Sequence, residues 1–337
     1  MSLTVVLHRD GMGAVLVSRC CVWAPPPSPP PLSFSYSQIG SLLFAGQWAT
    51  QGTAQLPPAG RRVIARRAFA PFVSLMMEAA AGVQGLVATG FFMGCELLLR
   101  APPAKRWITA QLTKPGEVLD EKQKAILFQQ ATSRIVAEVF NIVALPLAIL
   151  VLTDPAMWED RLRSNSVISN VLIMFCSGYF IHDTFVCGSQ VHHEGFLYLF
   201  HAVSCMSIYT YGMISGLQHL YGAVFILFEA STPLVHIHWF LHKTGNTGTK
   251  LYVLNGLAMV VVFFLARNVF GAVMSIDYFR LTTVELARTS GGDTLPEAII
   301  WGYRTVLVLM NLLNLFWVHK MILGAAKALR KQAKKAQ

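Results

Sequence analysis

Histidine and carboxylate residues gather in one stretch of this chain, between Gly178 and Leu241, where most neighbours are apolar or aromatic. Eight of the ten histidines fall between positions 182 and 242. Ionisable side chains are costly in hydrocarbon, so those retained in apolar sequence indicate a functional interior. The candidate residues are Tyr179, His182, Asp183, His192, His193, Glu194, His201, His219, Glu229, Ser231, Thr232, Pro233, His236 and His238.

The adjacent pair His192-His193 has the chemistry of a general base or an acyl-accepting nucleophile. An imidazole, whose pKa lies near neutral pH, can remove a proton from an amine that attacks an acyl thioester. A nearby carboxylate, Asp183 or Glu194, would fix its tautomer. The alternative is a pair of interfacial histidines that cap helix ends, and the sequence leaves both open.

Asp183 lies in long apolar sequence, where a carboxylate needs a partner or contact with water. His182 is adjacent and therefore points elsewhere on the helix. We expect the partner from another span, and the candidates are Arg267, His201 and His193. A structural salt bridge and a catalytic acid fit this pattern equally well.

Glu229 and Pro233 stand one helical turn apart on the same face. Proline removes a backbone hydrogen bond and exposes carbonyls, and broken helices at membrane depth mark binding sites. The alternative is a kink whose carbonyls are satisfied by the Ser231 and Thr232 hydroxyls. The predicted substrate-binding residues are Tyr179, His182, His201, Glu229, Ser231 and Pro233; the predicted catalytic residues are His192, His193 and Asp183.

His238 and His242 have the i, i+4 spacing that can bind a metal, with His236 nearby. Membrane di-iron enzymes with many histidines also carry two H-x-x-H-H boxes, and this sequence has none. We therefore predict neither a metal nor a cofactor. Acyl-CoA enters only as a co-substrate, if the protein transfers acyl groups.

The composition is that of a multi-pass membrane protein. Hydrophobic residues make up 54% of the 337 residues, charged residues make up 13%, and the mean hydropathy is +0.50. Soluble domains carry about 25% charged residues. The net charge is +10, but the cations flank apolar segments, so we expect no nucleic-acid partner. None of the six cysteines forms a C-x-x-C pair, so we interpret them as buried small residues.

The apolar segments predict an all-α bundle of seven membrane spans, each long enough for a hydrocarbon core of about 30 Å. The fourth and fifth segments could instead form a re-entrant pair. We expect Pro146 to kink the second span. Glycines 82, 85, 90 and 94 of the first span should let a neighbouring helix approach closely. The expected spans are residues 69–99, 125–152, 167–188, 196–213, 217–241, 251–274 and 298–323.

Three regions are expected along the chain: a proline-rich extension (1–60), a membrane domain (68–325) and a basic tail (326–337). The extension is either disordered or an organellar targeting segment. The distribution of Lys and Arg predicts a cytosolic C-terminus and an N-terminus on the opposite side. Lys334-Lys335 matches the dilysine signal that a retrieval coat reads, which predicts the endoplasmic reticulum. The alternative is a basic tail attracted to anionic lipid.

Four motifs in order, Gly178–Asp183, Val191–Gly195, Phe228–Pro233 and His238–Leu241, resemble the TLC domain family. This family includes ceramide synthases, translocating-chain-associating membrane proteins and less characterised lipid-linked proteins. The Glu-x-Ser-Thr-Pro element followed by Trp-Phe-Leu looks most like the TLC domain-containing protein 4 branch and its plant and algal relatives. The resemblance covers residues 68–330. It implies helices around a cavity for acyl chains or sphingoid bases, with membrane lipids as partners.

Ceramide synthases carry a His-His pair and a downstream His-Asp-x-x-Asp type element. This chain retains His192-His193 but has Glu229–Pro233 in place of the aspartates. The sequence therefore predicts a lipid-binding or lipid-regulating protein of lipid homeostasis. An acyl-CoA-dependent N-acyltransferase with His192 or His193 as base is the alternative. A transporter is a third hypothesis, supported only by the broken helix. The sequence leaves the oligomeric state open.

Overall fold

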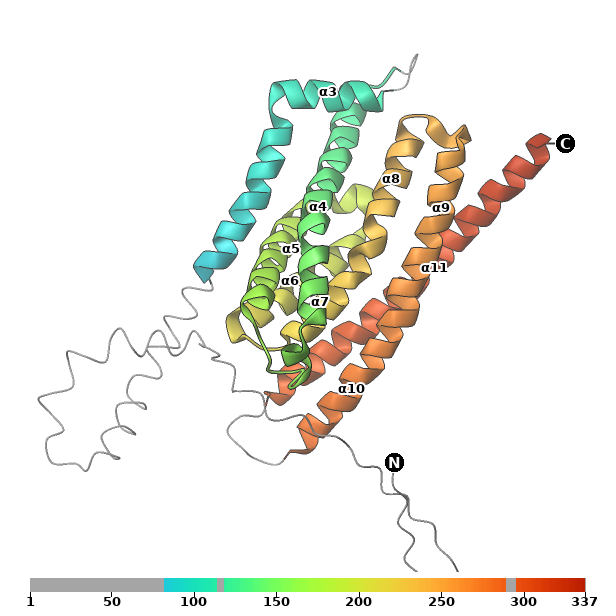
Figure 1. Cartoon of the computed structure of the whole chain (residues 1–337). Helices are drawn as coiled ribbons and strands as arrows, with labels where there is room; N and C mark the ends of the chain where they lie inside the picture. Colours follow the sequence, from blue (N-terminus) through green and yellow to red (C-terminus); the bar gives the residue numbers. More distant parts are fainter. Residues whose placement is uncertain (1–81, 114–117, 289–294, 337) are drawn as a thin grey trace, which may run out of the picture. The chain divides into compact units, whose positions relative to one another are not determined.

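The computed structural model describes residues 82–113, 118–288 and 295–336, and all regular structure within these ranges is helical. Seven of the described helices are long and apolar enough to cross a membrane (Figure 1). The prediction of an all-α multi-pass protein is therefore confirmed. The expected extension at 1–60 lies outside the described residues. The spans are Gly82–Arg100, Glu121–Thr153, Val167–Glu194, Phe196–Ser215, His219–Lys243, Lys250–Ala287 and Glu297–Lys327.

The second and third spans, α4 (Glu121–Thr153) and α5 (Val167–Glu194), begin at capping boxes that their sequences encode. The Asp120 carboxylate accepts from the Gln123 backbone N–H at 2.7 Å, and the Gln123 amide oxygen accepts from the Asp120 N–H. Ser166 and Ser169 exchange the same two bonds before α5. Each box satisfies backbone donors that a helix start leaves free, so both spans begin at defined residues.

The link between α5 and α6 (Phe196–Ser215) is shorter than expected. Residues 189–194 continue α5, so Gly195 is the whole connection. Gly195 has φ of +100°, a conformation that side chains disfavour, and this allows the chain to reverse at once. His192 and His193 therefore lie on the last turn of a helix and not in a loop.

The fifth and sixth spans are both irregular near their middles. In the fifth, α7 (His219–Ile226) is followed by a 3₁₀ segment, η2 (Leu227–Ser231), and by α8 (Thr232–Lys243). In the sixth, a π-helical segment, η4 (Phe264–Phe270), joins α9 (Lys250–Phe263) to α10 (Gly271–Ala287). The expected loop from residue 275 is instead helical to residue 287. The expected break in the fifth span is confirmed.

Charged side chains explain why α10 continues to Ala287, beyond the apolar segment that ends near residue 274. Arg161 Nη1 lies 2.5 Å from Asp277 Oδ2, and Arg163 forms an ion pair with Glu285. Both arginines lie between α4 and α5, so the polar end of α10 is attached to that connection. The hydrogen bond that Arg161 donates to the Asp277 carboxylate raises the pKa of Arg161 above its usual value. Residues 155–158 of the same connection form a short 3₁₀ helix, η1 (Pro155–Trp158).

The bundle core lies where α5 packs against α4, α6 and α7. The Phe140 and Tyr179 rings stack with centroids 3.9 Å apart, and Phe92 of the first span meets Tyr179 edge-on. Three of the four expected contact glycines, Gly82, Gly90 and Gly94, have open space where a Cβ would lie. That expectation was wrong for them. The close approach between the first span and α5 is made by Gly178 instead.

Consecutive spans alternate in direction, so connections after the odd-numbered spans lie at one end of the bundle. In Figure 1 this end carries α3 (Pro102–Leu112) and the short η3 (Asn246–Gly248) between α8 and α9. The last helix, α11 (Glu297–Ala336), ends on the same side by this alternation. The side chains of Lys334 and Lys335 lie outside the described set.

Candidate functional site

A cavity of about 280 Å³ lies among the helices, and its lining comes from six of the seven spans, all but the first. It extends along α5 from Tyr179 and Phe180 to Glu194 at the helix end. Its wall combines aromatic rings with an unusual number of ionisable groups for a membrane interior. The ionisable lining residues include Arg134, Asp183, Glu194, His201, Glu229, His236 and Arg267, and the aromatic ones include Tyr179, Phe180, Tyr198, Phe263 and Trp317.

Glu229 and Arg267 form the central ion pair of this cavity. Arg267 Nη2 lies 3.2 Å from Glu229 Oε1, and both side chains are largely buried. The same Nη2 donates to Thr232 Oγ1 at 3.2 Å, and Thr232 Oγ1 donates to Glu229 Oε2 at 2.6 Å. His201 Nε2 lies 3.8 Å from Glu229 Oε1. Buried charges are tolerated when they are paired and hydrogen-bonded, and this cluster meets both conditions.

The two irregular helix segments position this pair. Pro233 has no backbone N–H, and the 3₁₀ segment η2 precedes it. The Phe228 carbonyl accepts from Arg267 Nε at 2.8 Å, across the bundle from η4. The Ser231 hydroxyl also reaches this carbonyl, at 3.4 Å, so the expected local hydroxyl contact is present beside the longer-range one. π-helical segments are frequent at functional sites, and η4 carries Arg267.

Asp183 lines the same cavity without an ionic partner among the described residues. Its one hydrogen-bond contact is Cys187 Sγ at 3.7 Å, on the next turn of α5. We expected Arg267, His201 or His193 to pair with Asp183. That prediction was wrong, because Arg267 and His201 lie at Glu229 and His193 is exposed at the end of α5. The Asp183 carboxylate therefore faces the cavity with capacity to accept further hydrogen bonds.

A second group of charges lies at the α5–α6 end of the cavity. Arg134 Nη1 lies 3.5 Å from Glu194 Oε1, and its guanidinium stacks on the Trp239 ring at 4.3 Å. His236 Nδ1 pairs with Glu138. Arg134 falls within the expected second span, residues 125–152, but nothing in the sequence assigned it to a site.

The other predicted residues lie elsewhere. His192 and His193 are exposed on the last turn of α5 and do not line the cavity. His182 is buried, with Nε2 2.8 Å from Glu96 Oε2 of the first span. Ser231 is buried and Pro233 lies in the first turn of α8, and neither lines the cavity. Of the nine residues predicted as catalytic or substrate-binding, the cavity thus brings together four: Tyr179, Asp183, His201 and Glu229.

Two further histidines have structural contacts. His219 lies at the opposite end of the bundle, where Nδ1 is 2.9 Å from Ser169 Oγ. His238 stacks on the Tyr252 ring with centroids 4.2 Å apart. Within the described ranges, no three His, Cys, Asp or Glu side chains are grouped as a metal site requires.

The motifs and the cavity lie in a recognised domain. The family model of the TLC domain matches residues 130–323, more than half of the chain. The chain belongs to the TLC domain family. The TLC region contains every lining residue of the cavity, from Ser133 to Met321, whereas α3 and the start of α4 precede it. The resemblance seen in the sequence motifs is confirmed.

Relatives of this TLC protein occur in fungi and animals. A TLC domain-containing protein of Schizosaccharomyces pombe is 30% identical over 190 residues, which are 56% of this chain and 63% of the relative. Topoisomerase I damage affected protein 4 of Saccharomyces cerevisiae is 32% identical over 206 residues, covering 60% and 69%. Human TLC domain-containing protein 4 is 27% identical over 229 residues, covering 66% and 82%. The chain thus spans less than two thirds of the fission-yeast relative's length.

Proposed function

We propose that this TLC protein binds a membrane lipid in the cavity and thereby takes part in lipid homeostasis. The observation that supports this proposal is the Asp183 carboxylate, which faces an aromatic-lined intramembrane cavity without an ionic partner among the described residues. A lipid hydroxyl or amine would satisfy this carboxylate, and the rings of Tyr198 and Trp317 would contact the adjoining carbon chain. Glu229 and Arg267 already bind each other and Thr232, so their side chains would form part of the cavity wall.

Asp183→Asn tests this proposal because it removes the charge and keeps the shape. A charge-assisted hydrogen bond contributes about 1.5–3 kcal/mol, so the variant should retain at least about tenfold less of the bound lipid. The measurement is mass spectrometry of lipids that co-purify with the full chain in detergent. The matched control is His192→Ala with His193→Ala, which lies outside the cavity and should retain lipid like the wild type. Equal retention in all three proteins would contradict the proposal.

A second candidate is acyl-CoA-dependent N-acyl transfer, favoured by the position of His201. Its imidazole lines the cavity with Nε2 3.8 Å from Glu229 Oε1, so a candidate general base and a carboxylate lie side by side in the cavity wall. In this version His201, and not His192 or His193, removes the proton from the attacking amine. The same lipid analysis distinguishes the hypotheses. An acylated product that disappears in His201→Gln supports transfer by His201, and one that disappears only in the double alanine variant supports His192-His193.

Residence in the endoplasmic reticulum belongs to the same proposal and rests on the charge bias and on Lys334-Lys335. Lys334→Ser with Lys335→Ser should move an N-terminally tagged protein to later secretory compartments, as seen by fluorescence microscopy. The control is Lys327→Ser with Arg330→Ser, which removes the same charge from the same helix. If both variants stay, Lys334-Lys335 is not a retrieval signal. If both move, the pair acts only as basic charge.

A further inference from the structure

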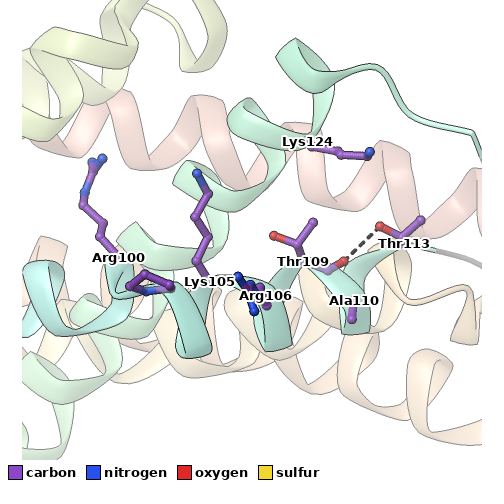
Figure 2. Close-up of a pocket in the computed structure, with 8 residues that line it drawn as sticks. Arg100, Lys105, Arg106, Thr109, Ala110, Thr113 and Lys124 are labelled. Atoms are coloured by element: carbon purple, nitrogen blue, oxygen red, sulfur yellow. Dashed lines mark hydrogen bonds between the residues drawn. The ribbon is translucent and has the colours of Figure 1, made fainter.

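A hollow of about 690 Å³ lies on the surface at the end of the bundle, apart from the cavity (Figure 2). It is formed where the first span, α3 and the start of α4 meet. Figure 2 shows Arg100 and Lys105 extending in the same direction from this junction. The lining residues are four cations and four neutral residues: Arg100, Lys105, Arg106 and Lys124, with Pro102, Thr109, Ala110 and Thr113.

The charge of the hollow is not neutralised by its own lining, which contains no carboxylate among the described residues. Arg100 and Lys124 each form an ion pair with an acid on their own helix, Arg100 with Glu96 at 2.6 Å and Lys124 with Glu121 at 2.8 Å. Lys105 and Arg106 are exposed and form no ion pair with a described residue. The hollow therefore presents net positive charge, together with two threonine hydroxyls, to whatever occupies it.

The depth of α3 places this charge in the headgroup layer of a membrane. Arg100 ends the first span, and Lys124 lies in the first turn of the next. Ile108 and Leu112 are buried against Phe128, so one face of α3 packs on the bundle. The Trp107 side chain is 65% exposed, as expected of an aromatic anchor at the interface. An exposed tryptophan and exposed cations on a helix that joins the ends of two spans place α3 at the level of the lipid headgroups.

We propose that this hollow binds the headgroup of an anionic phospholipid that carries phosphate monoesters. Basic pockets beside membrane helices bind such headgroups, and each nearby cation strengthens binding about fivefold. Two cations without an ion pair among the described residues, Lys105 and Arg106, beside the paired Arg100 and Lys124, match the charge of a phosphate monoester better than the single net charge of phosphatidylserine. The site lies outside the matched TLC region and outside the cavity, so it would let anionic lipid act on the protein independently of the cavity ligand.

The test is a binding titration of the purified full chain with short-chain phosphatidylinositol bisphosphate, followed by tryptophan fluorescence. Lys105→Gln with Arg106→Gln should weaken binding about twenty-fivefold, because two cations are lost at about fivefold each. Both side chains are exposed, so the fold should be preserved. The control, Lys243→Gln with Lys250→Gln, removes the same charge from the same end of the bundle and should bind like the wild type. Wild-type binding should also weaken as ionic strength rises.

Three results would overturn the proposal. Equal weakening in the two double variants would mean that the whole basic end attracts anions without a defined site. Equally tight binding of inositol trisphosphate or inorganic phosphate would mean a site for soluble anions and not for a lipid. Binding of short-chain phosphatidylserine as tight as that of the bisphosphate would remove the role of the phosphate monoesters. Asp183→Asn should leave this titration unchanged, which separates it from the cavity.

Discussion

Arg267→Met should destabilise the protein by about 3–5 kcal/mol, because it leaves the Glu229 carboxylate buried without its cation. The substitution also removes the donor to the Phe228 carbonyl beside the break in the fifth span. Thermal unfolding in detergent, followed by the loss of monodisperse protein, measures the effect. Arg280→Met is the matched control, because Arg280 lies exposed on the same long helix and should tolerate the change.

The double variant Arg267→Met with Glu229→Gln shows whether the pair itself carries the effect. A buried pair replaced as a whole costs much less than one broken by removing a single partner. The double variant should therefore be more stable than Arg267→Met alone, although it has two substitutions. If it is less stable by the sum of the single effects, the two residues act separately, and the ion pair does not explain the burial of Arg267.

The membrane spans were predictable because hydropathy acts within each segment. Seven apolar runs of sufficient length predicted seven helices, and the order of short motifs predicted the TLC family. The end of the sixth span was missed for a physical reason. Asp277 and Glu285 made its last turns look like a loop, but each pairs with an arginine of the α4–α5 connection. Hydropathy averaged over a short stretch of sequence contains no information on ion pairs between distant segments.

The sequence predicted several residues of the site, but not which of them form ion pairs. Asp183, Glu229 and Arg267 all stood out as charges in apolar sequence. Which of them meet depends on helix rotation and on the irregular segments η2 and η4, which shift the register of the side chains. His192 and His193 carried the strongest motif, yet α5 continues past its expected end and leaves both exposed. Their catalytic role remains a prediction.

Gly178→Ala should destabilise the protein by about 1–3 kcal/mol, whereas Gly90→Ala should be neutral or slightly stabilising. A Cβ on Gly178 would lie 2.4 Å from the Ala88 Cβ, 2.7 Å from the Ala88 carbonyl carbon and 2.8 Å from the Thr89 nitrogen. Backbone atoms cannot move aside like a side-chain tip, so the first span must shift away from α5. Gly90 has open space at the same position, and alanine is the better helix former.

Gly178→Ala should lower the free energy of unfolding, whereas Gly90→Ala should leave it unchanged or raise it slightly. This difference distinguishes the effect of a tertiary contact from that of helix propensity. Unfolding in detergent measures both variants. Ala88→Gly combined with Gly178→Ala should recover only part of the loss, because it removes the nearest atom and leaves the two backbone contacts. Full recovery would mean that the Ala88 methyl alone sets the helix spacing. No loss in Gly178→Ala would mean that the first span does not pack closely on α5. That result would also question the buried contact of Glu96 with His182, which joins the same two helices.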